Sequence, residues 1–306
     1  MRASRANLTN WSHKATDYHV SRSFGILVMT SKMIKIFRKI RYNLMSENKT
    51  GKPALPAGRY LKYAIGEIIL VVIGILIALS INNWNTNRID TNREATYIQN
   101  IKRDLDNQLQ AIDLQMAFEA STADACINSV SSYLNTNAFT VDSTFAQNLG
   151  AMTGRRTFLN PNPSYKELIA SGNIQLIKNE EFRNQLINYY QELERIEKII
   201  QGNNALFTDQ QFNPAILQLG FADQIALWDN VFGGFNTKYS SPRLLSASNV
   251  SHLIEISKEL LKDPANELTL ANYITKRETV AKIHLSLLIE FQVRTKKLIE
   301  AIDAYY

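Results

Sequence analysis

Histidine and cysteine are the side chains that most readily bind metals or act as bases and nucleophiles near neutral pH. The chain has four histidines and one cysteine, which are His13, His19, His252, His284 and Cys126. The sequence contains no G-x-S-x-G, H-E-x-x-H, P-loop or dinucleotide-binding glycine pattern. We therefore expect no catalytic activity, no metal site and no cofactor.

Two of these residues fall on apolar stripes of predicted helices. His284 lies on the stripe of the C-terminal helix, where we expect a hydrogen-bonded core histidine. Cys126 occupies a similar position, so it should be buried as a small apolar residue. A single cysteine also excludes an intramolecular disulfide.

A pair of arginines precedes a stretch of turn-forming residues. Ser164 to Glu167 has the S-x-x-E spacing of a capping box, so Ser164 is expected to cap a short helix. Basic side chains beside a helix N-terminus attract anions, and we predict an anion-binding site from Arg155, Arg156 and Ser164. The alternatives are that Glu167 or another carboxylate pairs with the arginines, or that they face water.

The framework that must position these residues begins with an apolar segment. Residues 64–81 form a run of 18 in which only Glu67 and Ser80 are polar beyond glycine. In a helix this run spans roughly 27 Å, close to the hydrocarbon thickness of a bilayer. Aromatic residues typical of membrane interfaces flank it, namely Tyr60, Tyr63 and Trp84. We predict a transmembrane helix at residues 60–84.

Two alternatives for this segment are a buried core helix and a signal peptide cleaved after Ser80. The apolar run is longer than that of most signal peptides, which favours an anchor. Glu67, Gly74 and Ala78 share one face of the predicted helix. Small residues allow helices to approach closely and a polar group can hydrogen-bond across them, so we expect a helix contact in the membrane there. Alternatively, Glu67 reaches water or Lys62.

Charge is distributed unevenly along the chain. Residues 1–62 carry 13 Lys+Arg and 2 Asp+Glu, a net charge of +11, whereas residues 63–306 carry 21 and 26, a net charge of −5. The positive-inside rule then predicts a single-pass protein of the cytoplasmic (inner) membrane, with its N-terminus in the cytoplasm and residues 85–306 outside. A basic tail on an acidic body favours anionic lipid, not nucleic acid, as the partner.

The residues before the anchor fall into two parts. Residues 1–32 are polar without a clear period, so we expect them to be disordered or to follow a mis-called start. Residues 33–59 begin with apolar residues on one helical face among basic ones, which is typical of a cytoplasmic amphipathic helix at the membrane surface. A loop rich in glycine and proline follows, from Ser46 to Arg59.

Beyond the anchor, the pattern is helical. Between Ile98 and Tyr133 mostly apolar residues recur at spacings of three and four, as in the heptads of a coiled coil, with Lys102 and Glu119 as exceptions. We expect a helix from Asn82 to Tyr133 that continues the transmembrane helix.

Further helices follow, with Asn179 and Asp263 as expected N-caps. The expected elements are a short helix from Ser164 to Gly172, one from Asn179 to Ile200, one from Ser248 to Lys262 and a last one from Pro264 to the C-terminus. The predicted fold is all-α, with residues 85–306 forming an antiparallel helical bundle of long heptad-patterned helices.

Four stretches resemble a known family. They are MIKIFRKIR (residues 33–41), SENK (46–49), YLKYAIGEIILVVIGILIALSINNWN (60–85) and SYKELIASGNIQLIKNEEFRNQLINYY (164–190). The family is an uncharacterised bacterial group of single-span membrane proteins, a domain of unknown function. The resemblance implies membrane anchoring and a helical outer domain, without an activity. Its members usually begin at the equivalent of Met33, which is why residues 1–32 are expected not to be translated.

These patterns favour a membrane-anchored interaction or structural module of the bacterial cell envelope. Its expected partners are the lipid bilayer and either further copies of the chain or an envelope protein. The alternative is an extracytoplasmic ligand-sensing bundle. The N-terminal side is too short to hold an output domain, so such a sensor would signal through a partner protein.

Overall fold

The computed structural model describes residues 57–159, 161–224 and 244–305, with the backbone alone for 57–63, together with Lys35, Arg38, Lys39 and Tyr42. The chain divides into two compact units, Met1–Ser80 and Ile81–Tyr306, which are described separately below. The expectations for residues 1–32 lie outside the described residues, as does most of the amphipathic segment at 33–59.

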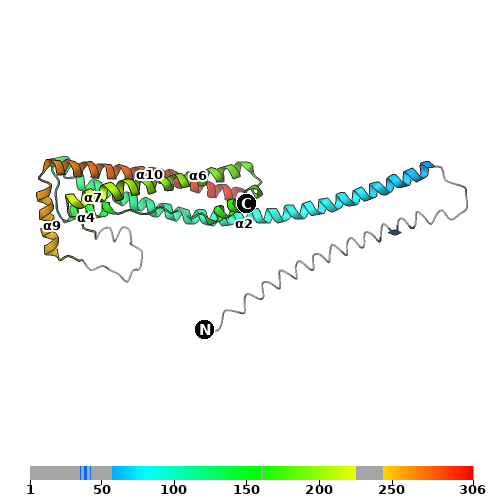
Figure 1. The fold of residues 1–306 in the computed structure, drawn as a ribbon, viewed down its shortest axis with the longest axis horizontal. Helices are drawn as coiled ribbons and strands as arrows, with labels where there is room; N and C mark the ends of the chain where they lie inside the picture. Colours follow the sequence, from blue (N-terminus) through cyan, green and yellow to red (C-terminus); the bar gives the residue numbers. More distant parts are fainter. Residues whose placement is uncertain are drawn as a thin grey trace, which may run out of the picture. The chain divides into compact units, whose positions relative to one another are not determined.

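Every regular element in the described part of the chain is a helix (Figure 1), as the all-α prediction requires. The elements are α2 (Ala57–Val130), α3 (Tyr133–Thr136), α4 (Ser143–Thr153), α5 (Pro163–Ala170), the 3-10 helix η1 (Asn173–Leu176), α6 (Glu180–Asn203), the π-helix η2 (Asn204–Phe212), α7 (Asn213–Leu219), α9 (Ala247–Leu260) and α10 (Pro264–Tyr305).

Helix α2 runs unbroken from the apolar segment into the heptad-patterned region, so the predicted continuity is confirmed. It ends at Val130, slightly before the expected Tyr133. Its apolar part contains a window with a mean hydropathy of 2.8, and none of that window is buried. Among the described residues, α2 is the one helix that is long and apolar enough to cross a membrane.

The second unit, Ile81–Tyr306, contains two hydrophobic cores. The first core joins α2, α5, α6 and α10, and its completely enclosed side chains include Ile98, Ile101, Leu105, Ile112, Leu168, Leu186, Leu193 and Leu288. The second core joins the end of α2 to α4, η2, α7, α9 and the start of α10, and it includes Cys126, Phe145, Leu149, Met152, Phe212, Ile216, Leu270 and Ile274.

Polar pairs between the long helices show in which direction each helix runs relative to the others. Three pairs join α2 to α10, namely Lys102 with Asp303, Asp113 with Gln292 and Glu119 with His284. Two pairs join α6 to α10, namely Tyr189 with Thr295 and Asn203 with His284. In both sets, residues later in one helix meet residues earlier in the other, so α10 runs opposite to α2 and to α6. Helices α2 and α6 therefore run in the same direction.

Residues 154–178, here called the return segment, lead back along α2 before α6 begins. Much of this segment is irregular, so its backbone N–H and C=O groups need partners from elsewhere. Four hydrogen bonds from α2 side chains meet this need: Gln115 Nε2 donates to Arg156 O (3.5 Å), Gln108 Nε2 donates to Pro161 O (2.9 Å), Asp104 Oδ2 accepts from Ser164 N (2.9 Å) and Glu94 Oε1 accepts from Lys178 N (3.0 Å). Polar residues on the buried face of α2 thus satisfy the backbone opposite them.

The capping box predicted at Ser164 is wrong. Helix α5 begins at Pro163, and its N-cap is Asn162, whose side chain makes no capping hydrogen bond. Proline at the first position lacks an N–H group, and the next N–H, that of Ser164, donates to Asp104. A carboxylate from a distant part of the sequence therefore replaces the local cap.

Two other predicted helix starts are confirmed, and a third is shifted. The Asn179 side chain accepts a hydrogen bond of 2.9 Å from Phe182 N, which confirms it as the N-cap of α6. Helix α10 begins at Pro264 as expected. Helix α9 is shifted from its predicted bounds, because Ser246 and Asn249 form a capping box that places the first residue at Ala247.

Candidate functional site

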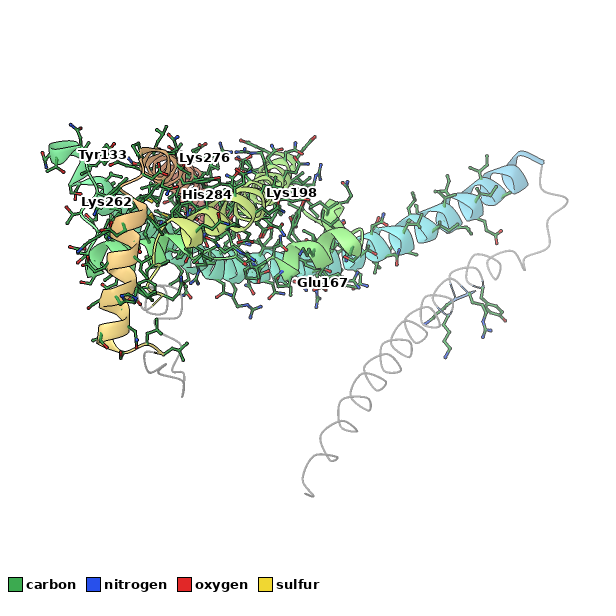
Figure 2. The ribbon with its side chains drawn as sticks, turned by 60° about the vertical axis from the view of Figure 1, so that its left-hand side comes forward. Tyr133, Glu167, Lys198, Lys262, Lys276 and His284 are labelled. Atoms are coloured by element: carbon green, nitrogen blue, oxygen red, sulfur yellow. The ribbon has the colours of Figure 1, made fainter. Side chains whose placement is uncertain are left out.

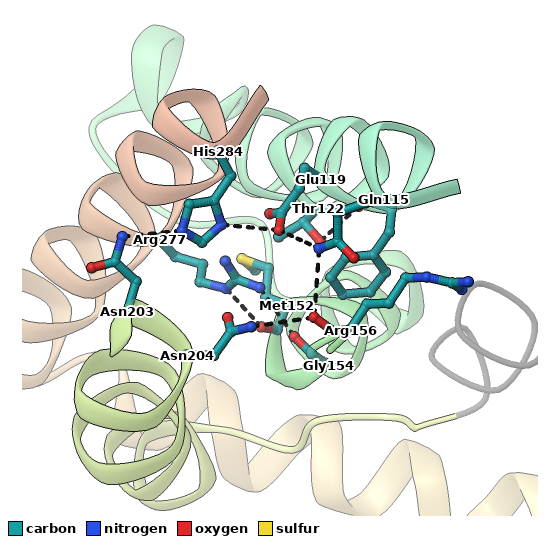
Figure 3. A network of polar contacts seen from close by, with 11 residues as sticks. Gln115, Glu119, Thr122, Met152, Gly154, Arg156, Asn203, Asn204, Arg277 and His284 are labelled. Carbon is teal, nitrogen blue, oxygen red and sulfur yellow. Dashed lines mark hydrogen bonds and ion pairs between the residues drawn. The ribbon is translucent and has the colours of Figure 1, made fainter. Parts of the chain in front are cut away.

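A layer of mostly buried polar side chains lies where the two cores of the second unit meet. Figure 3 shows the contacts within this layer. We call it the polar layer, and it consists of Gln115, Glu119, Asn203, Asn204, Arg277 and His284. On α2 it lies between Ile112 of the first core and Ala125 of the second. Glu119, His284 and Arg277 are at most 1% exposed, so these ionisable side chains are out of reach of solvent, whereas Asn203 is half-buried.

Glu119 and His284 form the central contact of the polar layer. His284 Nδ1 lies 2.9 Å from Glu119 Oε1, and His284 Nε2 lies 3.0 Å from Asn203 Nδ2. Because the amide nitrogen of Asn203 is a donor, Nε2 acts as the acceptor and Nδ1 carries the proton that it donates to Glu119. The imidazole ring thereby joins α2, α6 and α10.

The carbonyl oxygen of Arg156 is the second point at which side chains of the polar layer meet. Its carbonyl oxygen accepts from Asn204 Nδ2 at 3.3 Å and from Gln115 Nε2, which also donates to Glu119 Oε1 at 2.9 Å. Asn204 is the first residue of the π-helix η2, a helix type that is rare and often found at functional positions. Two helices thus hold one carbonyl group of the return segment.

Arg277 is a completely buried cation on α10. Its Nε donates to Met152 O at 3.1 Å and its Nη2 donates to Gly154 O at 3.0 Å. Burial lowers the pKa of Arg277, while the negative charge of Glu119 acts in the opposite direction. The guanidinium group therefore fixes the C-terminal end of α4 to α10.

The chemistry open to this layer is limited by its surroundings. The histidine faces a carboxylate and an amide, with no hydroxyl or thiol as its hydrogen-bond partner. Burial raises the pKa of the Cys126 thiol to about 12, which disfavours the nucleophilic thiolate. In the described part of the chain, no cluster of three or more His, Cys, Asp or Glu side chains could hold a metal ion. The geometry suits packing of helices, since its hydrogen bonds join α2, α6, η2 and α10 to one another and to the backbone at the end of α4 and after it.

A smaller polar cluster crosses the first core. Tyr189 Oη donates to Gln108 Oε1 at 2.7 Å and lies 3.0 Å from Thr295 Oγ1, so it also links α2, α6 and α10. The ring of the neighbouring Tyr190 stacks on Tyr165 of α5, with ring centroids 3.8 Å apart. These aromatic contacts hold α5 against α6.

Two groups of the predicted anion site already have partners, namely the Arg155 side chain and the N–H of Ser164. Arg155 Nε lies 2.9 Å from Asp209 Oδ2, which is the carboxylate alternative raised by the sequence. Arg156 contributes its carbonyl oxygen to the polar layer, and the N–H of Ser164 is taken by Asp104. At Arg155 and Ser164 an anion would have to displace Asp209 and Asp104, and the anion site stays a prediction.

The three residues of the predicted membrane contact lie in the first unit. Glu67 and Ala78 are exposed on α2. A methyl group added at Gly74 would meet no atom within 4 Å, so the chain places nothing of its own against this position. The contact between membrane helices also stays a prediction.

His284 is the buried, hydrogen-bonded core histidine that the sequence predicted, and Cys126 is buried as expected. In Figure 2, His284 lies among the helices, whereas Glu167 and Lys198 lie on the outer surface. No sequence pattern indicated Arg277, Gln115 or the two asparagines of the polar layer. The available signal was Glu119, a carboxylate in an apolar seam that required a buried partner.

The described residues define an all-helical protein in which one helix, α2, carries both an apolar segment long enough to span a membrane and part of a buried polar layer. Residues 67–225 match a family of unknown function, DUF6090, and the chain belongs to this family. This agrees with the resemblance to an uncharacterised family. No curated protein and no solved structure matches the chain.

Proposed function

We propose that this protein is a membrane-anchored helical module of the cell envelope that acts by contact, as an interaction or structural protein. The observation that supports the anchor best is that none of the most apolar window of α2 is buried. Ile68, Val71 and Leu76 are each more than half exposed there. Such a continuous apolar surface needs a covering, and a bilayer provides one of matching thickness.

The proposed orientation is that of a single-pass protein of the cytoplasmic membrane. The N-terminus lies in the cytoplasm and residues 85–306 lie outside as an antiparallel helical bundle. The net charge of +11 on residues 1–62 supports this orientation, because basic residues are retained on the cytoplasmic side. The polar pairs that set α10 against α2 and α6 support the bundle.

The burial of the charged side chains in the polar layer supports a function by contact with other molecules. Its charged side chains are enclosed by helices, so a substrate would reach them only after the helices separated. We propose a second copy of the chain or another envelope protein as the partner. The face formed by Glu67, Gly74 and Ala78 is the proposed contact within the membrane, since small residues permit close approach of helices.

The test is cross-linking in cells, followed by extraction in mild detergent and mass spectrometry of what remains bound. Gly74→Leu should reduce a cross-linked complex at least severalfold, because the larger side chain separates the helices. Gly66→Leu is the matched control, since it adds the same side chain about 80° away around the helix. Equal loss of the complex in both variants would contradict a contact through this face.

The anchor itself is tested by washing membranes with alkaline carbonate. The full chain should stay in the membrane pellet, and its release into the supernatant would contradict the proposal. A ligand-sensing role would show instead as ligand-dependent stabilisation of the wild type in a thermal-shift screen of anionic metabolites. That shift should be lost in Arg155→Ala.

A further inference from the structure

Glu119 and Arg277 carry opposite charges into the same part of the core, yet each keeps one polar atom without a partner. Glu119 Oε1 accepts from His284 and Gln115, and the Nε and Nη2 of Arg277 donate to two carbonyl groups. The remaining atoms, Glu119 Oε2 and Arg277 Nη1, have no hydrogen-bond partner, although both are buried. Leaving a buried charged group short of a hydrogen bond costs more than leaving a neutral one unpaired.

Arg277 lies seven residues before His284 on α10, so it shares a helix face with the histidine that contacts Glu119. The charge of Glu119 is the largest influence that opposes the effect of burial on Arg277. Figure 3 shows the guanidinium group beside the contact between Glu119 and His284. Two buried polar groups that attract each other without a direct hydrogen bond are commonly bridged by a bound molecule.

The charges on either side determine which molecule fits. An anion would be repelled by Glu119, and a cation would be repelled by Arg277. The occupant must be neutral, must accept a hydrogen bond from Nη1 and must donate one to Oε2. Water meets all three conditions and is the commonest buried partner of such groups.

We propose that the polar layer contains a binding site for one internal water molecule, which bridges Arg277 Nη1 and Glu119 Oε2. The water converts two separately unsatisfied charges into a water-mediated ion pair between α10 and α2. This pair completes the hydrogen bonding that ties the end of α4, through Arg277, to the central contact of Glu119 with His284. The inference is independent of the proposed membrane anchor.

The experiment is a crystal structure of the full chain at a resolution sufficient to place ordered water. The expected result is a density peak within hydrogen-bond distance of both Arg277 Nη1 and Glu119 Oε2, without anomalous signal. A direct bond between these two atoms would overturn the proposal. So would a peak with the anomalous signal of an ion, or the absence of any peak.

A solution measurement gives a second readout. Oxygen-17 relaxation dispersion counts water molecules that stay bound long enough to tumble with the protein. Arg277→Met removes the donor and should lower this count by one. Arg294→Met, which changes an exposed arginine of the same helix, should leave the count unchanged. Equal counts in all three proteins would contradict the site, and if Arg277→Met fails to fold, the wild-type crystal structure decides.

Discussion

Single polar residues inside the apolar stripes determine how the helices of the second unit fit together. Glu119 interrupts the heptad pattern of α2, and it is 1% exposed in the structure. Removing one partner from a buried charged pair leaves the other partner unsatisfied, which costs far more than the pair contributes as a whole. The residues of the polar layer should therefore tolerate single substitutions poorly.

His284→Leu tests this expectation. It deprives Glu119 of a donor and Asn203 of an acceptor, so we expect the free energy of unfolding to fall by about 3 kcal/mol. His252→Leu is the matched control, because this histidine is exposed on α9 and should change stability by about 0.5 kcal/mol or less. Chemical denaturation followed by circular dichroism measures both, and equal losses would contradict the special role of His284.

The Cys126 thiol should be unreactive in the folded protein. It is 1% exposed, and burial raises its pKa from 9.0 to about 12, so the thiolate fraction at pH 8 falls roughly a thousandfold. A disulfide reagent should therefore titrate no thiol until the chain unfolds. In Asp124→Cys, which adds a thiol at an exposed position on the same helix, one of two thiols should react at once. Rapid reaction of the wild type would disprove the burial.

At the scale of elements, the start of α5 depends on a side chain of α2. Asp104→Ala removes the acceptor of the Ser164 N–H group, and loss of a helix cap typically costs about 1 kcal/mol. Hydrogen exchange at the first residues of α5 should accelerate severalfold, while the middle of α6 stays protected. Asp106→Ala replaces an exposed carboxylate of α2 and serves as the control. No difference between the variants would contradict the role of Asp104.

Helix α6 should make the protein sensitive to alkaline pH. Burial raises the pKa of Tyr190 well above its usual value of 10.0, and the neighbouring Tyr189 raises it further. Above pH 10 the unfolded chain loses this proton while the folded protein keeps it, so the free energy of unfolding falls as the pH rises. Below pH 10 this contribution is constant. The slope due to one tyrosine reaches about 1.4 kcal/mol per pH unit.

Tyr190→Phe should reduce that slope, as measured by denaturation between pH 8 and pH 11 (from about two units below to about one unit above the usual tyrosine pKa). The substitution should cost little at pH 7, because the Tyr190 hydroxyl has no hydrogen-bond partner to lose. Tyr305→Phe, which replaces a half-exposed ring at the end of α10, is the control. An unchanged slope in Tyr190→Phe would contradict the burial of its hydroxyl.

The sequence predicted elements well where the signal was local. The apolar run and the heptad spacing predicted α2, and Asn179 predicted the start of α6, because periodicity and caps involve residues a few positions apart. It failed at α5, since the group that satisfies Ser164 is Asp104, distant in the chain. The polar layer was not predicted for the same reason. Glu119 showed that a partner was needed, but no pattern indicated that His284 would supply it.

At the scale of the whole second unit, the two cores should behave as separable regions of stability. They share α2 and α10 and meet at the polar layer, but most of their other elements differ. Proteins commonly open in such units, each with its own free energy. Hydrogen exchange should therefore detect two groups of amides with different protection.

A pair of core variants tests this separation. Phe212→Ala creates a cavity in the second core and should cost about 3 to 5 kcal/mol, with loss of protection mainly in α4, α7 and α9. Leu186→Ala does the same in the first core and should act mainly on α5 and α6. Hydrogen exchange measured by mass spectrometry distinguishes the two patterns. Uniform loss of protection in either variant would show a single cooperative unit.

The way in which the return segment is held has a consequence for how this family diverges. Arg277, Gln115, Asn204 and Gln108 all bind carbonyl oxygens of residues 152–161, and carbonyl groups are the same whatever the side chain. Selection should therefore conserve the four donors, while many side chains of the segment that they hold are free to vary. Among relatives, an exposed position such as Leu159 should vary freely, while the donors, which come from three helices, should be retained together.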